Sequence, residues 1–263
     1  GRVGDDALGR RVVRELRAEG IHVHAPLGPG RTGVMLKEKR TPHTTGVYFY
    51  RAGSAGSTLA PQDVPMDAVT GADLVHVTGI SAALSASARA TVDHVVDSAR
   101  SAGVPVSFDV NHRPSLWRDE DPGELYRSIA SRSDIVFAGD DEARLLLGRE
   151  TASDDRLALA QAIAQLGPRE AVIKLGHRGS VALIEGETVV EPALTVAVVD
   201  TVGAGDAFVA GYLASRLTGG DALARVRQGV TAGAFACLHA GDWEGLPRRQ
   251  DLALLHIEEP VSR

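Results

Sequence analysis

The stretch that decides the fold is VVDTVGAGDAFVAG, residues 198–211. An apolar run with one threonine, residues 194–199, leads into it and predicts a strand. Small residues at 203–205 predict a tight turn, and Asp206 opens a strongly apolar helical stretch. The first N–H groups of a helix have no partner within the helix, so this order of strand, glycine turn and helix predicts an anion site, above all for phosphate.

Asp206 is unusual at such a site, because a carboxylate repels a bound anion. Its presence is explained if a group beside the phosphate must lose a proton, since a carboxylate can accept one. On the residues alone, an ordinary helix start with an acidic first turn also fits.

Composition limits the class of protein. The chain has 263 residues, of which 44% are hydrophobic and 24% are charged, as in one large soluble α/β domain. The net charge is −6 with no basic tract, so no nucleic-acid partner is expected. Cys237 is the one cysteine, so no internal disulfide forms and the reducing cytoplasm is the expected location. No stretch is apolar enough to span a bilayer, so no membrane partner is expected.

Strand-like and helix-like segments alternate from residue 73 onward, which predicts a mostly parallel sheet covered by helices on both faces. Expected strands are residues 74–77, 104–110, 135–138, 171–175 and 194–199, with a hairpin at 180–190. Expected helices are residues 85–102, 124–132, 141–147, 154–166, 221–239 and 248–258, besides the one that Asp206 opens. Before this region we expect a helix at 5–19 and a strand at 21–25, and we take residues 1–263 as a single domain.

Residues 33–39 and 45–51 are two strand-like runs outside this alternation. Tyr48 and Tyr50 fall on one face of the second run, with Val47 and Phe49 on the other. Residues 33–51 are therefore expected to contribute the strands of a small β lid, which would exclude water during a group transfer.

Polar clusters follow four of the expected strands, at residues 111–113, 139–142, 176–179 and 200–206. The carboxyl ends of the strands of an open parallel sheet form the binding crevice. We therefore expect all four clusters at one edge of the sheet.

The string DTVGAGDAFxAG closely resembles the signature of the ribokinase-like (PfkB) carbohydrate kinases. YFYRAGSAGS, FDVNHRPSLW and GDWEGLP resemble the 2-keto-3-deoxygluconate kinases within that family. The resemblance implies a ribokinase-like fold, ATP and Mg²⁺ as cofactors, and phosphorylation of a small sugar acid at its terminal hydroxyl. In that family GRVGDD lies well inside the domain, so this chain is expected to lack the leading elements.

The resemblance also implies roles at the phosphate. Asp206 becomes the base that accepts the proton of the sugar hydroxyl. The backbone donors to the transferring phosphoryl group come from Gly203, Ala204 and Gly205.

The nucleotide and the metal have their own candidate residues. The nucleotide-side loop is represented by Lys174, Gly176 and Gly179. Glu142 matches the acid that organises magnesium through water, although Gly139 stands where the family has asparagine. Asp200, with Thr201, is the candidate ligand of a monovalent cation.

Arg51 and Arg113 point to the substrate class, because guanidinium forks bind the carboxylate of a sugar acid well. In the resembled enzymes two arginines contact that carboxylate, and lid tyrosines, here Tyr48 and Tyr50, line the sugar. Two alternatives stay open: a neutral-sugar kinase of the fructokinase or ribokinase type, and a non-catalytic sugar- or nucleotide-binding relative. By analogy with relatives, we expect a homodimer through the lid strands.

Overall fold

The structure, a computed structural model, describes residues 1–41, 44–117, 120–148 and 154–256. The chain divides into two units, Gly1–Pro122 and Gly123–Arg263, which are described separately. Within the described ranges, none of the helices combines the length and the apolar character needed to cross a membrane.

The first unit begins with β1 (Val3–Gly4), which pairs in parallel with β2 (Leu27–Gly28). Between them α1 (Ala7–Ala18) starts as predicted, because the carboxylate of Asp6 accepts the N–H of Gly9 at 2.7 Å and caps the helix. The expected strand at 21–25 is wrong, since the chain there is irregular and pairing with β1 begins at Leu27. Strand-like composition is not sufficient where no neighbouring backbone lies alongside.

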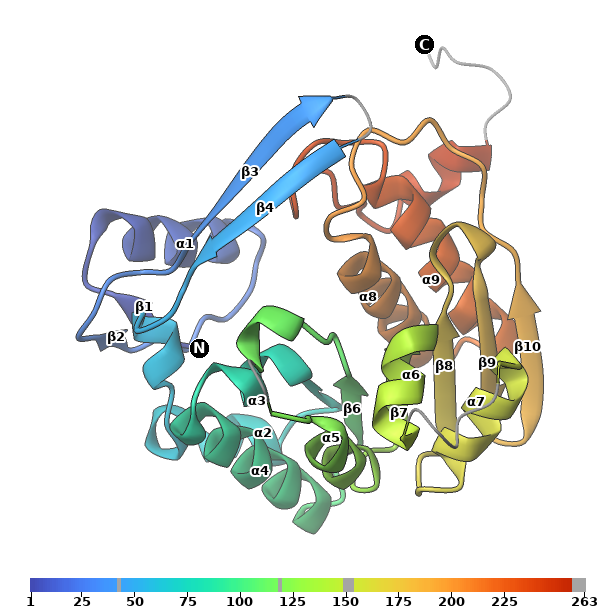
Figure 1. Ribbon diagram of the computed structural model, residues 1–263, viewed down its shortest axis with the longest axis horizontal. Helices are drawn as coiled ribbons and strands as arrows, with labels where there is room; N and C mark the ends of the chain where they lie inside the picture. The colour runs from blue at the N-terminus through green and yellow to red at the C-terminus, as the bar shows by residue number, and fades with distance from the viewer. Residues whose placement is uncertain (42–43, 118–119, 149–153, 257–263) are drawn as a thin grey trace. The chain divides into compact units, whose positions relative to one another are not determined.

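The two lid strands form as predicted, with β3 (Val34–Thr41) and β4 (Thr44–Tyr50) in one antiparallel pair (Figure 1). Leu36 lies opposite Tyr48, and Val34 lies opposite Tyr50. Because cross-strand partners share a face, these four side chains lie on the same face of the lid. All four residues are exposed, by 44% to 67% of their surface.

After the lid, the first unit continues as an α/β arrangement. Its elements are η1 (Ala55–Thr58), η2 (Pro61–Asp63), α2 (Met66–Thr70), β5 (Val75–Thr78), α3 (Gly79–Leu84), α4 (Ala86–Ser101), β6 (Val106–Asp109) and η3 (Pro114–Leu116). β5 and β6 are parallel, and all four residues of β6 are buried. The short α3 was not anticipated, because its GISAAL sequence has too few turns for a helical period.

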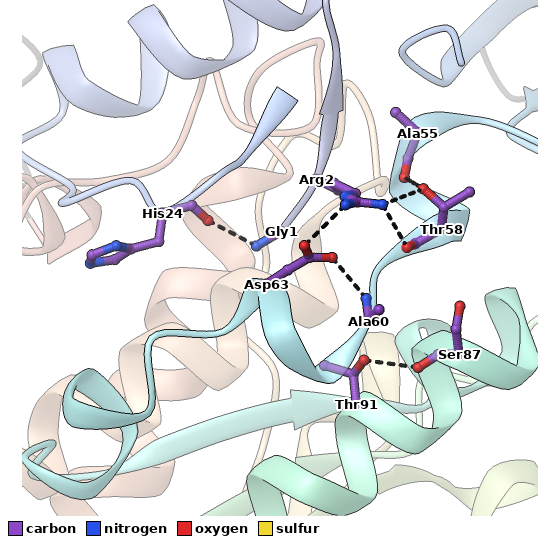
Figure 2. Close-up of polar contacts among 9 residues, drawn as sticks. All are labelled: Gly1, Arg2, His24, Ala55, Thr58, Ala60, Asp63, Ser87 and Thr91. Carbon is purple, nitrogen blue, oxygen red and sulfur yellow. Dashed lines mark hydrogen bonds and ion pairs between the residues drawn. The ribbon is translucent and has the colours of Figure 1, made fainter. Parts of the chain in front are cut away.

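Arg2 fastens the segment that follows the lid to β1 (Figure 2). Its Nη1 donates to the carbonyl and the hydroxyl of Thr58, both at 3.1 Å, and its Nη2 donates to Asp63 at 3.0 Å. Asp63 in turn accepts the N–H of Ala60 at 2.9 Å. A bifurcated guanidinium of this kind holds η1 and η2, and thereby the base of the lid, in one position.

The second unit carries its own sheet in the order β10-β9-β8-β7. Its elements up to this sheet's edge are α5 (Gly123–Ala130), β7 (Ile135–Gly139), α6 (Asp140–Leu147), α7 (Arg156–Ala164), β8 (Glu170–Lys174), η4 (Gly176–Arg178), β9 (Ser180–Ile184) and β10 (Glu187–Glu191). β7 and β8 are parallel, whereas β9 and β10 form the predicted hairpin. Successive residues of β7 and β8 are buried, so both faces of these strands are covered.

Two helices and a final 3-10 turn complete this unit: α8 (Ala204–Leu217), α9 (Ala222–Ala236) and η5 (Asp251–His256). α8 and α9 pack closely, since a Cβ on Gly211 would stand 2.8 Å from that of Ala232 (Figure 1). The expected helix at 248–258 is only the short η5, and residues 257–258 lie outside the described ranges. The expected helix at 221–239 ends at Ala236.

The expected strand at 194–199 is also wrong. Residues 192–198 have no regular structure, and the N–H of Val199 donates instead to the carbonyl of Cys237, just beyond α9, at 2.8 Å. The turn at 203–205 is therefore held by the end of a helix rather than by a sheet neighbour.

Candidate active site

Gly203 provides the turn that opens α8. Its φ is +83°, and a Cβ there would stand 2.4 Å from the carbonyl oxygen of Asp242, so only glycine fits. The N–H of Ala204 donates to Thr201 at 3.3 Å, whereas the N–H of Gly205 has no hydrogen bond within the described residues. Gly205 thus presents an available donor at the positive end of a 14-residue helix.

Lys174 brings a positive charge to the same place. Its ammonium nitrogen is 3.8 Å from the position that a Cβ on Gly205 would occupy. Because Lys174 is the last residue of β8, the strand places its side chain at the carboxyl edge of the sheet. An ammonium, a free N–H and a helix N-terminus at one point form an arrangement suited to a phosphate.

Asp206 lies in the first turn of α8 and is exposed. The residue is therefore at the surface and not in the core. An exposed carboxylate beside an anion site can accept a proton from a hydroxyl that attacks the anion.

The nucleotide-side loop has the backbone that its glycines predict. Gly176 and Gly179 have φ of +56° and +93°, and a Cβ on Gly179 would overlap the carbonyl of Glu191. The loop is tied to the start of α6 by Arg178, whose Nη2 donates to Asp140 at 2.8 Å. Burial alone would raise the pKa of Asp140, but the hydrogen bond from Arg178 and the nearby arginine charges lower it overall.

Glu142 already has a task in the helix that carries it. Its Oε2 accepts the N–H of Gly139 at 2.7 Å, which caps α6 where glycine supplies no capping side chain. Gly139 pairs in register with Lys174, so Glu142 belongs to the same edge of the sheet as the anion turn. No group of three His, Cys, Asp or Glu side chains suited to a metal ion is found in the part of the chain that the structure describes.

Asp200 organises the loop around the anion turn. Its Oδ1 accepts the N–H of Val202 at 3.1 Å, and its Oδ2 accepts the N–H of Gly241 at 3.5 Å. The side chain therefore joins the 200–206 segment to the 241–242 segment.

Arg51 and Arg113, both in the first unit, are close enough to influence each other electrostatically. Desolvation lowers the pKa of Arg51, and the positive charge of Arg113 lowers it further. Nη2 of Arg51 is buried and has no hydrogen-bond partner among the described residues, whereas Nη1 of Arg113 donates to the carbonyl of His112 at 3.0 Å. A buried, unpaired N–H beside a second cation is suited to an anionic ligand.

Tyr48 and Tyr50 lie on the other side of the lid from Phe49, because Phe49 pairs with Met35 on the opposite face. Tyr48 donates to Glu38 at 3.3 Å. Phe49 is the aromatic residue against Arg51, with its ring centre 4.3 Å from the guanidinium carbon.

Residues 1–249 match the family described as pfkB family carbohydrate kinase. This chain belongs to that family. It is 36% identical over 257 residues to 2-dehydro-3-deoxygluconokinase of Bacillus subtilis (strain 168), with 96% of this chain and 78% of the relative covered. It is 35% identical to 2-dehydro-3-deoxygluconokinase of Thermoproteus tenax, with 94% and 75% covered. The crystal structure of PfkB protein from Polaromonas sp. JS666 has a TM-score of 0.82 at 31% identity, and covers 95% of this chain and 81% of its own.

The fold and the enzyme class implied by the resemblance are thereby confirmed. This pfkB-family kinase has a ribokinase-like α/β fold with a mostly parallel sheet flanked by helices. Its activity is that of a carbohydrate kinase, which transfers a phosphoryl group to an alcohol.

Sequence reasoning missed two contacts of the candidate residues, one in each unit. The backbone of Asp242 packs against Gly203, and Phe49 supports Arg51. Both stood in quoted strings, GDWEGLP and YFYRAGSAGS, but nothing local in those strings specifies the contact.

Proposed function

We propose that this kinase transfers the terminal phosphoryl group of ATP to the 6-hydroxyl of 2-keto-3-deoxygluconate. The observation that carries the substrate class is the buried, unpaired Nη2 of Arg51 beside the charge of Arg113. Two neighbouring cations repel each other, and a carboxylate between them would relieve both the repulsion and the unpaired donor. The identity to two relatives named 2-dehydro-3-deoxygluconokinase supports the specific sugar acid.

The phosphoryl half of the reaction is assigned to the second unit. Lys174 and the N–H of Gly205 bind oxygens of the transferring group and stabilise the charge on them. Asp206 accepts the proton of the attacking hydroxyl as the bond to phosphorus develops. The sugar is proposed to contact Tyr48 and Tyr50. The nucleotide is proposed to contact Gly176 and Gly179.

The residues present fit magnesium as the metal. Mg²⁺ keeps several waters and takes one or two carboxylates together with substrate phosphates, so it needs no cage of three protein ligands. Glu142 would hold it through water at the sheet edge shared with Lys174. The ion, when bound, neutralises charge on the phosphates. Asp200 is proposed for a monovalent cation, and a compartment with ATP and free thiols, the cytoplasm, is the proposed location.

A neutral sugar gives the two arginines no counter-charge, so fructokinase or ribokinase activity is the less favoured alternative. A non-catalytic binding protein would have no need of the exposed carboxylate of Asp206 beside an anion turn.

The deciding experiment is a coupled assay of ADP release with 2-keto-3-deoxygluconate, fructose and ribose as acceptors. We expect a kcat/KM for the sugar acid at least about 10-fold above that for either neutral sugar. Asp206→Asn should lower kcat by about 10²- to 10⁴-fold while the Kd of the sugar acid changes little. A faster reaction with a neutral sugar would overturn the substrate, and full kcat in Asp206→Asn would overturn the mechanism.

We also propose that two copies pair through the lid strands, with the exposed Val34 and Leu36 at the contact. An apolar face of this kind gains stability when a second copy covers it. Light scattering should detect a dimer, and Leu36→Glu should shift it to monomer, whereas Lys39→Glu, further along the same strand, should not. A monomeric wild-type protein would contradict the pairing.

A further inference from the structure

Glu170 is a buried carboxylate that no part of the proposed reaction uses. It is 1% exposed and is the first residue of β8, the strand whose last residue is Lys174. The two are four positions apart, roughly 13 Å at about 3.3 Å per residue. Glu170 therefore lies at the end of the strand away from the anion turn.

The carboxylate accepts hydrogen bonds from two helices. From α8, the hydroxyl of Tyr212 donates to Oε2 at 2.5 Å and Nε of Arg216 donates to Oε1 at 2.9 Å. From α9, Nη1 of Arg225 donates to Oε1 at 3.1 Å. A buried charge with this many donors is well compensated, and each bond to it is stronger than one between neutral groups.

Tyr212 is held as a donor by its surroundings. Desolvation and then the charge of Glu170 raise the pKa of its hydroxyl, so the proton stays on oxygen. Its ring packs edge-on against Phe137 of β7, with ring centres 5.0 Å apart. Phe208, one turn nearer the start of the helix, also packs edge-on against Phe137, at 6.3 Å. The aromatic packing against β7 and the bonds to Glu170 of β8 together hold α8 on these two strands.

α8 is the helix that begins at the anion turn, and a helix transmits an axial shift along its whole length. A shift of α8 along β8 would change the distance between Lys174 and Gly205. At present the ammonium nitrogen of Lys174 is 3.8 Å from the position that a Cβ on Gly205 would occupy. The shift would move Asp206 by the same amount, and misplacement of about 1 Å can cost about 100-fold in rate.

We infer that Glu170 is a positioning residue for phosphoryl transfer. Through Tyr212 and Arg216 it sets α8 along β8, so that Gly205 and Asp206 stay aligned with the ammonium of Lys174. The inference rests on the proposed roles of these three residues at the phosphate. Arg225, which reaches the same carboxylate from α9, contributes to stability but not to this alignment.

The chain supplies a matched set of variants for the test. Tyr212→Phe removes one bond from α8 and keeps the ring packing, whereas Arg225→Gln removes the bond from α9 to Glu170 and a second bond to the carbonyl of Gly220. Ile163→Val, in the buried core of the same unit, controls for general loss of stability. Glu170→Gln removes the charge itself.

Kinetics are measured at 25 °C, well below each melting temperature, together with the Kd of the sugar acid by titration calorimetry. We expect Tyr212→Phe to lower kcat about 5- to 20-fold and Glu170→Gln about 10- to 100-fold, with the sugar Kd within about 2-fold of wild type. Arg225→Gln and Ile163→Val should lose melting temperature but keep kcat within about 2-fold.

Two results would overturn the positioning role. One is a wild-type kcat in Tyr212→Phe with only a lower melting temperature. The other is an equal fall in kcat in Arg225→Gln, which would mean that kcat follows stability alone. If the wild type prefers a neutral sugar, the proposed substrate is wrong, and the same series is then read with that sugar. If Glu170→Gln does not fold, Tyr212→Phe decides.

Discussion

The guanidinium carbon of Arg51 lies 4.3 Å from the ring centre of Phe49, and the Nη2 of this guanidinium is buried without a partner among the described residues. The negative face of the ring attracts the cation and holds it in one orientation. Phe49 thus orients the side chain of Arg51, and the unpaired Nη2 can donate a hydrogen bond to an acceptor on a ligand.

Phe49→Leu should therefore weaken binding of the sugar acid. Leucine keeps the apolar bulk but has no ring face, so we expect KM for the sugar acid to rise about 2- to 5-fold, the equivalent of about 0.5–1 kcal/mol. Phe49→Tyr keeps the ring and should remain within about 2-fold of wild type. Steady-state kinetics check this, and an unchanged KM in Phe49→Leu would argue against the support.

Arg51→Lys should have a larger effect, because an ammonium cannot reproduce the fork of a guanidinium. We expect the Kd of the sugar acid to rise about 10- to 100-fold, in the range of a charge-assisted hydrogen bond, with little change for fructose. Arg40→Lys is the matched control, since Arg40 is an exposed lid arginine paired with Glu38 at 3.3 Å. Titration calorimetry with both sugars measures the difference. Equal losses for fructose and the sugar acid would contradict carboxylate recognition.

Gly203→Ala and Gly205→Ala should differ in their effect on stability, because a Cβ is strained and crowded at 203 but has space at 205. Alanine at 203 would take φ of +83° and meet the carbonyl of Asp242, so we expect a loss of about 1–3 kcal/mol and a lower melting temperature. Gly205 has 3.8 Å of clearance to the ammonium of Lys174, so alanine there should leave the melting temperature within about 2 °C. Calorimetry distinguishes the two, and equal melting temperatures would be inconsistent with a strained turn.

Asp6→Asn should reduce stability at neutral pH but much less in acid. Hydrogen bonds from the N–H of Thr32, then from Gly9 and the Thr32 hydroxyl, lower the pKa of Asp6 from 3.8 to about 2. Because the folded pKa lies below the unfolded one, the contribution of Asp6 is complete above about pH 4 and is lost as the pH falls towards 2.

Urea unfolding at several pH values from 7 down to about 2.5 measures this dependence. Asp5→Asn is the control, since within the described part of the chain Asp5 forms an exposed ion pair with Arg10. The difference in the free energy of unfolding between Asp6→Asn and wild type should shrink as the pH falls. If this difference is the same at every pH, the hydrogen bonds do not favour the charged form of Asp6 over the protonated form.

The alternation of strands and helices and the lid strands were predictable because each depends on a local repeat. β7, β8, β3 and β4 all form within a few residues of the expected bounds. The strands at 21–25 and 194–199 failed because local composition carries no information about whether a neighbouring backbone is present. Leu27 pairs with β1 and Val199 bonds to Cys237, contacts that only the folded chain provides.

The sequence by itself determined the family, the glycine turn before α8 and the acidic first turn with Asp206, because small residues and helix starts are specified within a few positions. Only the tertiary structure decided that Lys174 meets Gly205, that Arg51 rests on Phe49 near Arg113, and that Glu170 joins two helices to one strand. Contacts of this second kind join residues that in most cases are far apart in the chain. Their partners are chosen by packing and burial, which no local pattern encodes.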